Sequence, residues 1–392
     1  MFRVVHRLPT AFLFTVAALP AAAGGLSEAL VGGTPSLDLR WRYENVSAPA
    51  ADAEAATVRT RLGYRSGEWA GWSAFAEFED VHEAGADDYT TPSNGALATS
   101  KGPKAAGRAV VADPVGTELN QAYLQYRGAG AVLRYGRQRI VRDDARFVGN
   151  VGWRQAEQTF DGFSAEWRQE AGWQAFAAYL TRRNTITFTT IDQDTRLFEI
   201  GHAAVLGGML KLFRYDVRND TAGAERWETT GVRFSPAFGP VKLTAVFARQ
   251  EQETGASPGY ARLAVDWTVG DGGLLAGFER LANDGAAAFQ TPLATLHAYN
   301  GWADRFLVTP ASGLDDAFLG ARWRFGAHGV QLVFHDYAAD AGSADLGSEW
   351  NGAWTWAFAE RWKLGAKFAS YRQGDAAPED VDKAWLWLEF SL

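Results

Sequence analysis

The chain has 392 residues, no cysteine and a formal net charge of −8, with 46 acidic against 38 basic side chains. The absence of cysteine excludes disulfides, thiol catalysis and cysteine-ligated metal centres, and the acidic balance argues against nucleic acid as a partner. Aromatic residues make up 13% of the chain and there are 42 glycines, which favours strands joined by tight turns over helices. Beyond the N-terminus, no stretch approaches the roughly 18 consecutive apolar residues of a membrane helix.

Residues 1–23 have the three parts of a secretory signal peptide. Arg3 and Arg7 form a basic start, residues 8–19 are apolar, and a run of alanines supplies the cleavage site. We therefore expect residues 1–23 to be removed on export. Residues 24–392 are expected to form the mature domain, with strands from about residue 36.

Apolar and polar residues alternate with a period of two along almost the whole mature chain, as in half-buried strands. The runs at 36–46 (SLDLRWRYENV) and 57–66 show the pattern most clearly. Further runs begin near residues 69, 118, 131, 159, 173, 196, 209, 229, 241, 260, 273, 316, 329, 349, 362 and 383. The pattern predicts about eighteen strands and no long helix.

The connections between these runs alternate between short and long. Short turns are expected near residues 67, 129, 170, 207, 238, 271, 327 and 360. Long polar loops are expected at 81–117, 140–158, 183–195, 217–228, 282–315, 338–348 and 373–382. Such alternation is typical of a transmembrane barrel with tight periplasmic turns, long extracellular loops and an even strand count. The sequence thus predicts an all-β fold, an antiparallel transmembrane β-barrel of about 18 strands, whose closure leaves no unpaired edge in lipid.

Two further patterns concern the surroundings of such a barrel. Several tryptophans lie within a few residues of the short turns, where an aromatic girdle meets the membrane interface. The last residues, 382–392, form an amphipathic strand that resembles the recognition signal of the outer-membrane assembly machinery. Outer-membrane lipid, lipopolysaccharide and that machinery are therefore expected partners. The tryptophans in question are Trp69, Trp167, Trp173, Trp267, Trp323 and Trp362.

Charged faces of the strands must point into the lumen, because a charge on the lipid face costs ~2–4 kcal/mol at the membrane midplane. The first strands therefore project a cluster of arginines and nearby glutamates inward. These charges either neutralise one another in a polar lumen or form a cationic track for anionic solutes, and the arginine density favours the track. The residues concerned are Arg40, Arg42, Arg59, Arg61, Glu77 and Glu79.

Residues 136–162 form the most charged structured stretch of the chain. Arg134 and Gln138 share one strand face, and Arg137 and Arg139 share the other. A bulge at Gly136 would exchange the two faces, so that a different set of residues points inward after it. The segment either folds inward and narrows a pore or forms a solvated outer loop, and its apolar residues at 147, 148, 151 and 153 favour packing. Its other arginines include Arg142, Arg146 and Arg154.

Seven stretches resemble the alginate export family of Gram-negative outer-membrane channels. They are LDLRWRYENV (37–46), TVRTRLGYRSG (57–67), FAEFEDV (75–81), DPVGTELNQAYLQY (113–126), GRQRIVRDDARFVGNVGWRQAEQTFDG (136–162), TLHAYNGWADRFLVTPASGLDD (295–316) and DKAWLWLEF (382–390). The resemblance implies a monomeric eighteen-stranded barrel whose basic lumen passes an anionic polyuronate outward. It also implies that matching positions line the pore, namely Arg40, Arg42, Arg59, Arg61, Arg137, Arg139, Arg146 and Arg154.

Three functions stay open at this stage. The first is passive passage or export of an anionic polysaccharide or sugar acid through an arginine-lined lumen, and the second is a general porin for small anions. The third is a barrel-type hydrolase of lipid or lipopolysaccharide, for which the G-x-S-x-G match around Ser257 is weak because no helix follows it. Neither cofactor nor metal is expected, and acid pairs such as Asp143 and Asp144 are interpreted as loop charges rather than Ca²⁺ ligands. Strand rules alone fit both trimeric porins and monomeric exporters.

Overall fold

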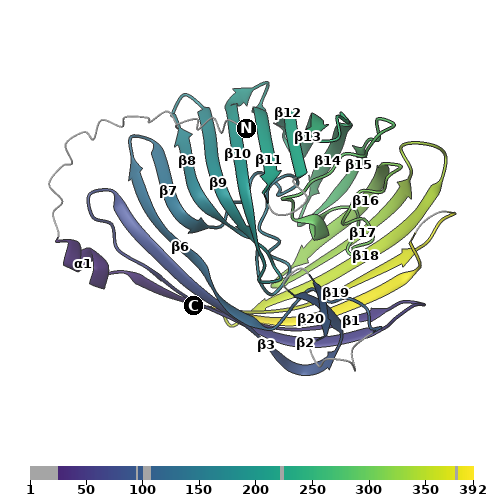
Figure 1. Cartoon of the computed structure of the whole chain (residues 1–392), viewed down its shortest axis with the longest axis horizontal. Coiled ribbons are helices and arrows are strands. Elements are labelled where there is room, and N and C mark those ends of the chain that lie inside the picture. The colour runs from purple at the N-terminus through teal and green to yellow at the C-terminus, as the bar shows by residue number, and fades with distance from the viewer. Residues whose placement is uncertain (1–24, 94–95, 100–106, 221–224, 376–377) are drawn as a thin grey trace, which may run out of the picture.

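Eighteen strands form one closed antiparallel barrel, in which each strand pairs with the next and the last strand pairs with the first (Figure 1). The computed structural model describes residues 25–93, 96–99, 107–220, 225–375 and 378–392. The expected signal peptide, residues 1–23, lies outside the described residues and stays a prediction. Among the described residues no helix is long and apolar enough to cross a membrane.

The helix α1 (Leu26–Val31) precedes the barrel, and a short pair, β4 (Thr90–Ser93) and β5 (Ala96–Thr99), lies between β3 and β6. A 3-10 turn, η2 (Leu296–Ala298), lies between β15 and β16. The barrel strands are β1 (Thr34–Ser47), β2 (Ala53–Arg65), β3 (Trp72–Asp88), β6 (Gly116–Gly128), β7 (Ala131–Gln138), β8 (Thr159–Arg168), β9 (Trp173–Asn184), β10 (Thr190–Val205), β11 (Gly208–Asn219), β12 (Glu225–Phe238), β13 (Val241–Gln252), β14 (Gly259–Val269), β15 (Gly272–Leu281), β16 (Leu314–Phe325), β17 (His328–Ala338), β18 (Asp345–Phe358), β19 (Trp362–Arg372) and β20 (Val381–Ser391).

Each of the eighteen barrel strands corresponds to one predicted run, so the predicted all-β barrel is confirmed. Three of the predicted long loops are long, at 89–115, 139–158 and 282–313. The connections of β9 to β10, β11 to β12, β17 to β18 and β19 to β20 are shorter than predicted. The strands there continue as paired polar extensions, in which for example Arg182 lies opposite Asp192. The polarity of these residues had suggested loops instead of strands.

The two faces of the strands differ as predicted. Arg40, Arg42 and Glu44 of β1 are buried inside the barrel, whereas Leu62 of β2 is 58% exposed on the outer face. Five of the six predicted girdle tryptophans are exposed near the short turns, with 37–49% relative exposure for Trp167, Trp173, Trp267, Trp323 and Trp362, whereas Trp69 is half-buried. Lipid is the natural environment of this outer apolar face.

The predicted bulge at Gly136 lies instead one strand away. The register shift is between Asp161 and Gly162, where β8 pairs with β9, and Gly136 is the β7 partner of Gly162. Both glycines have positive φ, 126° and 156°. A Cβ would lie 2.3 Å from the Ala122 oxygen at Gly136 and 2.1 Å from the Tyr179 oxygen at Gly162, so both positions exclude a side chain.

Candidate functional site in the barrel lumen

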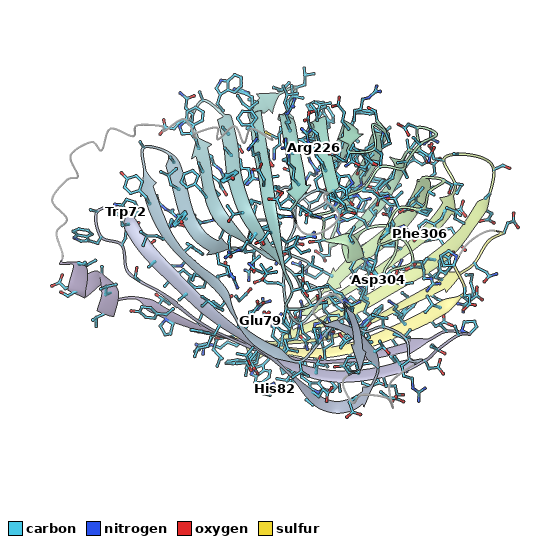
Figure 2. All side chains as sticks on the ribbon, viewed as in Figure 1. Trp72, Glu79, His82, Arg226, Asp304 and Phe306 are labelled. Carbon is cyan, nitrogen blue, oxygen red and sulfur yellow. The ribbon has the colours of Figure 1, made fainter. Side chains whose placement is uncertain are left out.

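Two of the long loops fold into the barrel instead of lying over it, and coil segments are visible inside the ring of strands in Figure 1. The loop 139–158 follows β7, and the loop 282–313 follows β15. They contact each other through a bridge between Val148 and Leu293. Figure 2 shows Glu79 of β3 and Asp304 of the second loop within the ring. The prediction that the charged segment folds inward is therefore confirmed.

Arg146 attaches the loop 139–158 to the opposite wall. Its Nε and Nη2 donate to the two carboxylate oxygens of Glu279 on β15, at 2.7 and 3.1 Å. Its remaining donors reach Thr291 at 3.2 Å and Asn300 at 3.1 Å, and the side chain is 2% exposed. A fully paired, buried guanidinium of this kind acts as a structural clamp.

The acids that precede Arg146 in the loop face basic residues of the wall. Asp144 binds Arg233 of β12 at 2.9 Å and Arg262 of β14 at 3.0 Å, while Asp143 binds Lys211 of β11 at 2.6 Å. Arg233 and Arg262 hold the pKa of Asp144 below its usual value, although burial opposes them. Further ion pairs of this loop with the wall join Arg142 to Glu199 and Glu166, and Arg154 to Glu44.

Apolar contacts complete the attachment of the loop. The ring of Phe147 lies 5.1 Å from the rings of both Phe213 and Tyr260, which point inward from β11 and β14. Val148 is 1% exposed. The apolar residues of the segment therefore pack against the lumen wall, as the sequence predicts.

Arg40, Arg42, Arg59 and Arg61 lie together on β1 and β2, as predicted, and Arg40 is directly opposite Arg59. They are, however, covered by the loop 139–158, with relative exposures of 5, 1, 4 and 8%. Most of their donors are used within the protein, and all four arginines donate to oxygens of residues 152–155, so the cluster holds the loop. The partners are Gln155 and the Gly152 oxygen for Arg40, Asp113 for Arg42, Asp38 for Arg59 and Glu79 for Arg61.

The predicted glutamates belong to the same buried network. Glu79 accepts from Arg61, and the Oε1 of Glu77 lies 3.9 Å from the Nη2 of Arg139. Sequence reasoning did not single out Glu157, whose Oε2 accepts from the Nε of Arg139 at 2.6 Å. Burial opposes ionisation of Glu157, but Arg61 and Arg139 lower its pKa to about 2. The loop therefore carries a fixed negative charge at its C-terminal base.

The other predicted arginines differ in environment. Arg137, at the end of β7, donates to Asp161 at 2.8 Å. Arg134, three residues nearer the short turn, donates from Nε to Gln125 at 2.9 Å and has no ion pair within the described residues. The charge of Arg134 is therefore not balanced by a neighbouring acid, whereas that of Arg137 is.

Asp304 in the loop 282–313 is a central acceptor that sequence reasoning missed. It binds the Nη2 of Arg154 at 3.0 Å, the Nζ of Lys383 on β20 at 3.2 Å and the Nδ1 of His297 at 2.7 Å. Burial opposes its ionisation, yet these neighbours hold the pKa of Asp304 well below its usual range. Alternation places Lys383 inside the barrel, but no local signal connects it to an acid far away in sequence.

An aromatic cage surrounds Lys367 of β19. Its Nζ lies 3.7 Å from the ring centre of Trp302 and 4.2 Å from that of Trp153, so both lumenal loops contribute a ring. It also donates to the Nε2 of His297 at 2.6 Å. Trp385, which alternation places on the inner face of β20, completes the cage at 5.3 Å. The cage fastens both loops to the wall near the β19–β20 pair.

His297 gives the attachment of the loop 282–313 a pH dependence. Burial and the charge of Lys367 lower the pKa of His297 to about 3, below the value of about 6.5 expected once the loop is released. The released state therefore binds more protons between these values, so attachment is full above pH 6.5 and weakens as the pH falls toward 3. We expect single-channel conductance to rise when the pH is lowered from 7 to 4. In His297→Gln, which keeps an amide donor and acceptor but does not titrate, the rise in conductance should be smaller; an equal rise there would contradict the assignment.

Three cavities lie along the strands and the lumenal loops. Toward the short turns lie a cavity of about 550 Å³ along β6–β8 and one of about 480 Å³ along β14–β18. Toward the long loops lies a cavity of about 420 Å³ between Val110, Arg154 and Leu307. Ser257 is remote from these features: its hydroxyl accepts from Arg249 at 2.6 Å, and its backbone NH donates to Asp284.

The family model for alginate export matches residues 35–234. The solved structure of OccK3 (OpdO) from Pseudomonas aeruginosa is similar over 94% of this chain and 98% of its own, at 15% identity and a TM-score of 0.68. OccAB2 from Acinetobacter baumannii is similar over 93% and 99%, at 12% identity and a TM-score of 0.69. OpdK from Pseudomonas aeruginosa, solved with vanillate, is similar over 93% and 99%, at 14% identity and a TM-score of 0.66.

At these identities the likeness to the solved structures shows the fold, and the comparison with curated proteins gave no match. The family model spans more than half of the chain, including β1, β2 and the whole loop 139–158. The closed eighteen-stranded architecture is shared with an outer membrane protein, OpdK. The chain belongs to the alginate export family of outer-membrane β-barrel proteins.

Proposed function

We propose that this barrel is a non-catalytic channel that passes small anionic solutes, sugar acids in particular, across the outer membrane. The observation that carries the proposal is the charge of the inner face toward the short turns, where basic strand residues outnumber acidic ones among the described residues. The basic residues are Arg65, Arg127, Arg134, Arg168, Lys242, Arg322, Arg324 and Lys363, and the acidic ones are Asp38, Glu166, Asp266 and Glu389.

Successive weak sites suit a channel, because a solute must enter readily and still leave. Guanidinium groups can pair with a carboxylate through two hydrogen bonds, which adds recognition to simple attraction. Family membership supports an anionic solute, and OpdK, a protein of the same fold, was solved with vanillate, a small carboxylate. The two lumenal loops favour small solutes over a folded polymer. Passage of an extended polyuronate is the finer proposal, and it requires these loops to move.

The predicted site residues then divide into two groups. Arg134, which has no ion pair among the described residues, and Arg139, which is 38% exposed although it is paired with Glu157, are proposed to meet the solute directly. The others are proposed to act through the loop that they position and through their charge. They are Arg40, Arg42, Arg59, Arg61, Arg137, Arg146, Arg154, Glu77 and Glu79. Lipid, lipopolysaccharide and the assembly machinery, through β20, remain proposed partners of the outer surface.

The test is the reversal potential of the refolded mature protein in a planar bilayer under a KCl gradient. We expect anion selectivity, because the cationic inner face raises the local concentration of anions. Liposome swelling should also be faster with glucuronate than with glucose. Cation selectivity, or the absence of any conductance, would contradict the proposal. Hydrolysis of lipopolysaccharide that is lost in Ser257→Ala would support the hydrolase instead.

A further inference from the structure

The cavity of about 550 Å³ along β6–β8 is lined by three arginines and one acidic residue, so its charge is not balanced. Arg127, Arg134 and Arg168 come from three neighbouring strands, and Glu166 is the acid among the lining residues. Arg127 lies two residues beyond Gln125, which is buried on the inner face, so alternation places Arg127 on that face too. Three positive charges therefore face one small volume at the short-turn mouth of the barrel.

Glu166 does not neutralise this group, because it is shared. Its Oε1 lies 3.5 Å from the Nη1 of Arg142, in the lumenal loop, and its Oε2 lies 3.8 Å from the Nη2 of Arg168. Neither Arg127 nor Arg134 has an ion pair within the part of the chain that the structure describes. The cavity thus carries a net positive charge and guanidinium donors without a carboxylate acceptor.

Arg134 is held in position by uncharged groups. Its Nε donates to the Oε1 of Gln125 at 2.9 Å, and its Cζ lies 5.5 Å from the ring centre of Tyr123. The hydroxyl of Tyr123 in turn accepts from the Nη2 of Arg65 at 3.1 Å. These contacts restrict the side chain and leave Nη1 and Nη2 of Arg134 for another acceptor. Such preorganisation lowers the ordering cost of binding an anion.

We propose that this cavity is a carboxylate-binding subsite, which holds a sugar acid or one uronate unit at the short-turn mouth. The inference rests on the proposed function for the class of solute, and it adds the place and the residues of binding. The volume falls within the range of about 300–1,000 Å³ that is usual for small-molecule sites. Arg134 and Arg127 bind the carboxylate, and Val132 between them offers an apolar surface to the sugar ring.

The subsite also has a continuation toward the interior. Glu166 and Arg168 line a second, narrow cavity together with Arg142 and Lys211, directly below the loop 139–158. In this second cavity both Arg142 and Lys211 are already paired with Glu199. The guanidinium donors without a carboxylate partner therefore lie at the mouth, on Arg127 and Arg134.

The experiment measures block of KCl current by D-glucuronate, added to one side of a bilayer that holds the channel in a known orientation. We expect block from the short-turn side at lower concentration than from the long-loop side. In Arg127→Gln/Arg134→Gln, the half-blocking concentration on the short-turn side should rise about tenfold. Arg361→Gln is the matched control, since it removes an exposed basic side chain from the short turn between β18 and β19, outside this cavity.

Each outcome separates the subsite from the proposed function. Unchanged block in the double variant, or an equal rise in Arg361→Gln, would overturn the subsite while anion selectivity of the wild type upholds the channel. If the wild-type protein is not anion-selective, the proposed function is wrong. A direct readout without current, the change in NMR line width of glucuronate with detergent-solubilised protein, should show the same tenfold difference. If the double variant broadens the glucuronate signal as the wild type does, the subsite is wrong.

Discussion

Arg146→Met is expected to release the loop 139–158 and to raise single-channel conductance severalfold. The substitution leaves Glu279 buried without its bidentate partner, and breaking a buried pair in this way costs about 3–5 kcal/mol. Each 1.4 kcal/mol changes an equilibrium constant about tenfold, so the equilibrium between attached and released loop shifts toward release by about a hundredfold or more. Asn300 and Thr291 lose a donor at the same time. Conductance steps in a planar bilayer measure the effect directly.

The double variant Arg146→Met/Glu279→Gln is the control for this clamp. It removes both charges, so the loop loses an attraction without leaving a buried charge behind, and its conductance should lie close to that of the wild type. Heat-modifiable migration on a gel verifies that the barrel has formed in each variant. Wild-type conductance in Arg146→Met would mean that this clamp does not hold the loop.

Asp304→Asn is expected to free the loop 282–313 with an effect of similar size. The carboxylate accepts from Arg154, Lys383 and His297, and its neutralisation leaves the buried Lys383 without a carboxylate, whereas Arg154 keeps Glu44. The expected cost is again about 3–5 kcal/mol. Limited trypsin digestion gives the readout. Trypsin cleaves after Arg305, and this bond is protected as long as the next residue, Phe306, stays buried at 5% exposure. Cleavage there should become rapid, and anion selectivity should increase.

Asp284→Asn is the matched control in the same loop. Asp284 accepts from the backbone NH of Ala286 and Ala287 at the loop surface, away from the cluster around Asp304. Its substitution should leave both trypsin resistance and conductance at wild-type values. If Asp304→Asn also resists trypsin, the three donors do not hold the loop through this carboxylate.

The strands and their orientation could be predicted from sequence because the membrane imposes a simple rule. A residue that faces lipid must be apolar, so alternation identifies both the strand and its inner face. Arg40, Arg59 and Lys367 all lie on the predicted side. The inward position of the loop 139–158 also had a local signal, since Phe147 and Trp153 are costly to expose together.

The partners of the lumenal charges had no such signal. Arg146 and Glu279 are 133 residues apart, and many inward-facing acids satisfy alternation equally well. The first arginines were interpreted as a free cationic track because sequence shows charge but not coverage. Burying a guanidinium without an acceptor is unfavourable, so once a loop covers Arg42 or Arg61 each must find an acid. The arginines that stay free, such as Arg134, are those beyond the reach of the loop.

The closing pair of strands has a consequence for the order of assembly. Asp38 on β1 meets Ser391 on β20 across a separation of 353 residues, so this seam can form only after the rest of the barrel has been inserted. The loop 139–158 binds both β1 and β15, on opposite sides of that nascent structure. A complete binding surface for it exists only when the ring has closed. We therefore expect the interior to fill after the ring has closed, so that protein sampled early in refolding gives larger and noisier current steps than the finished barrel.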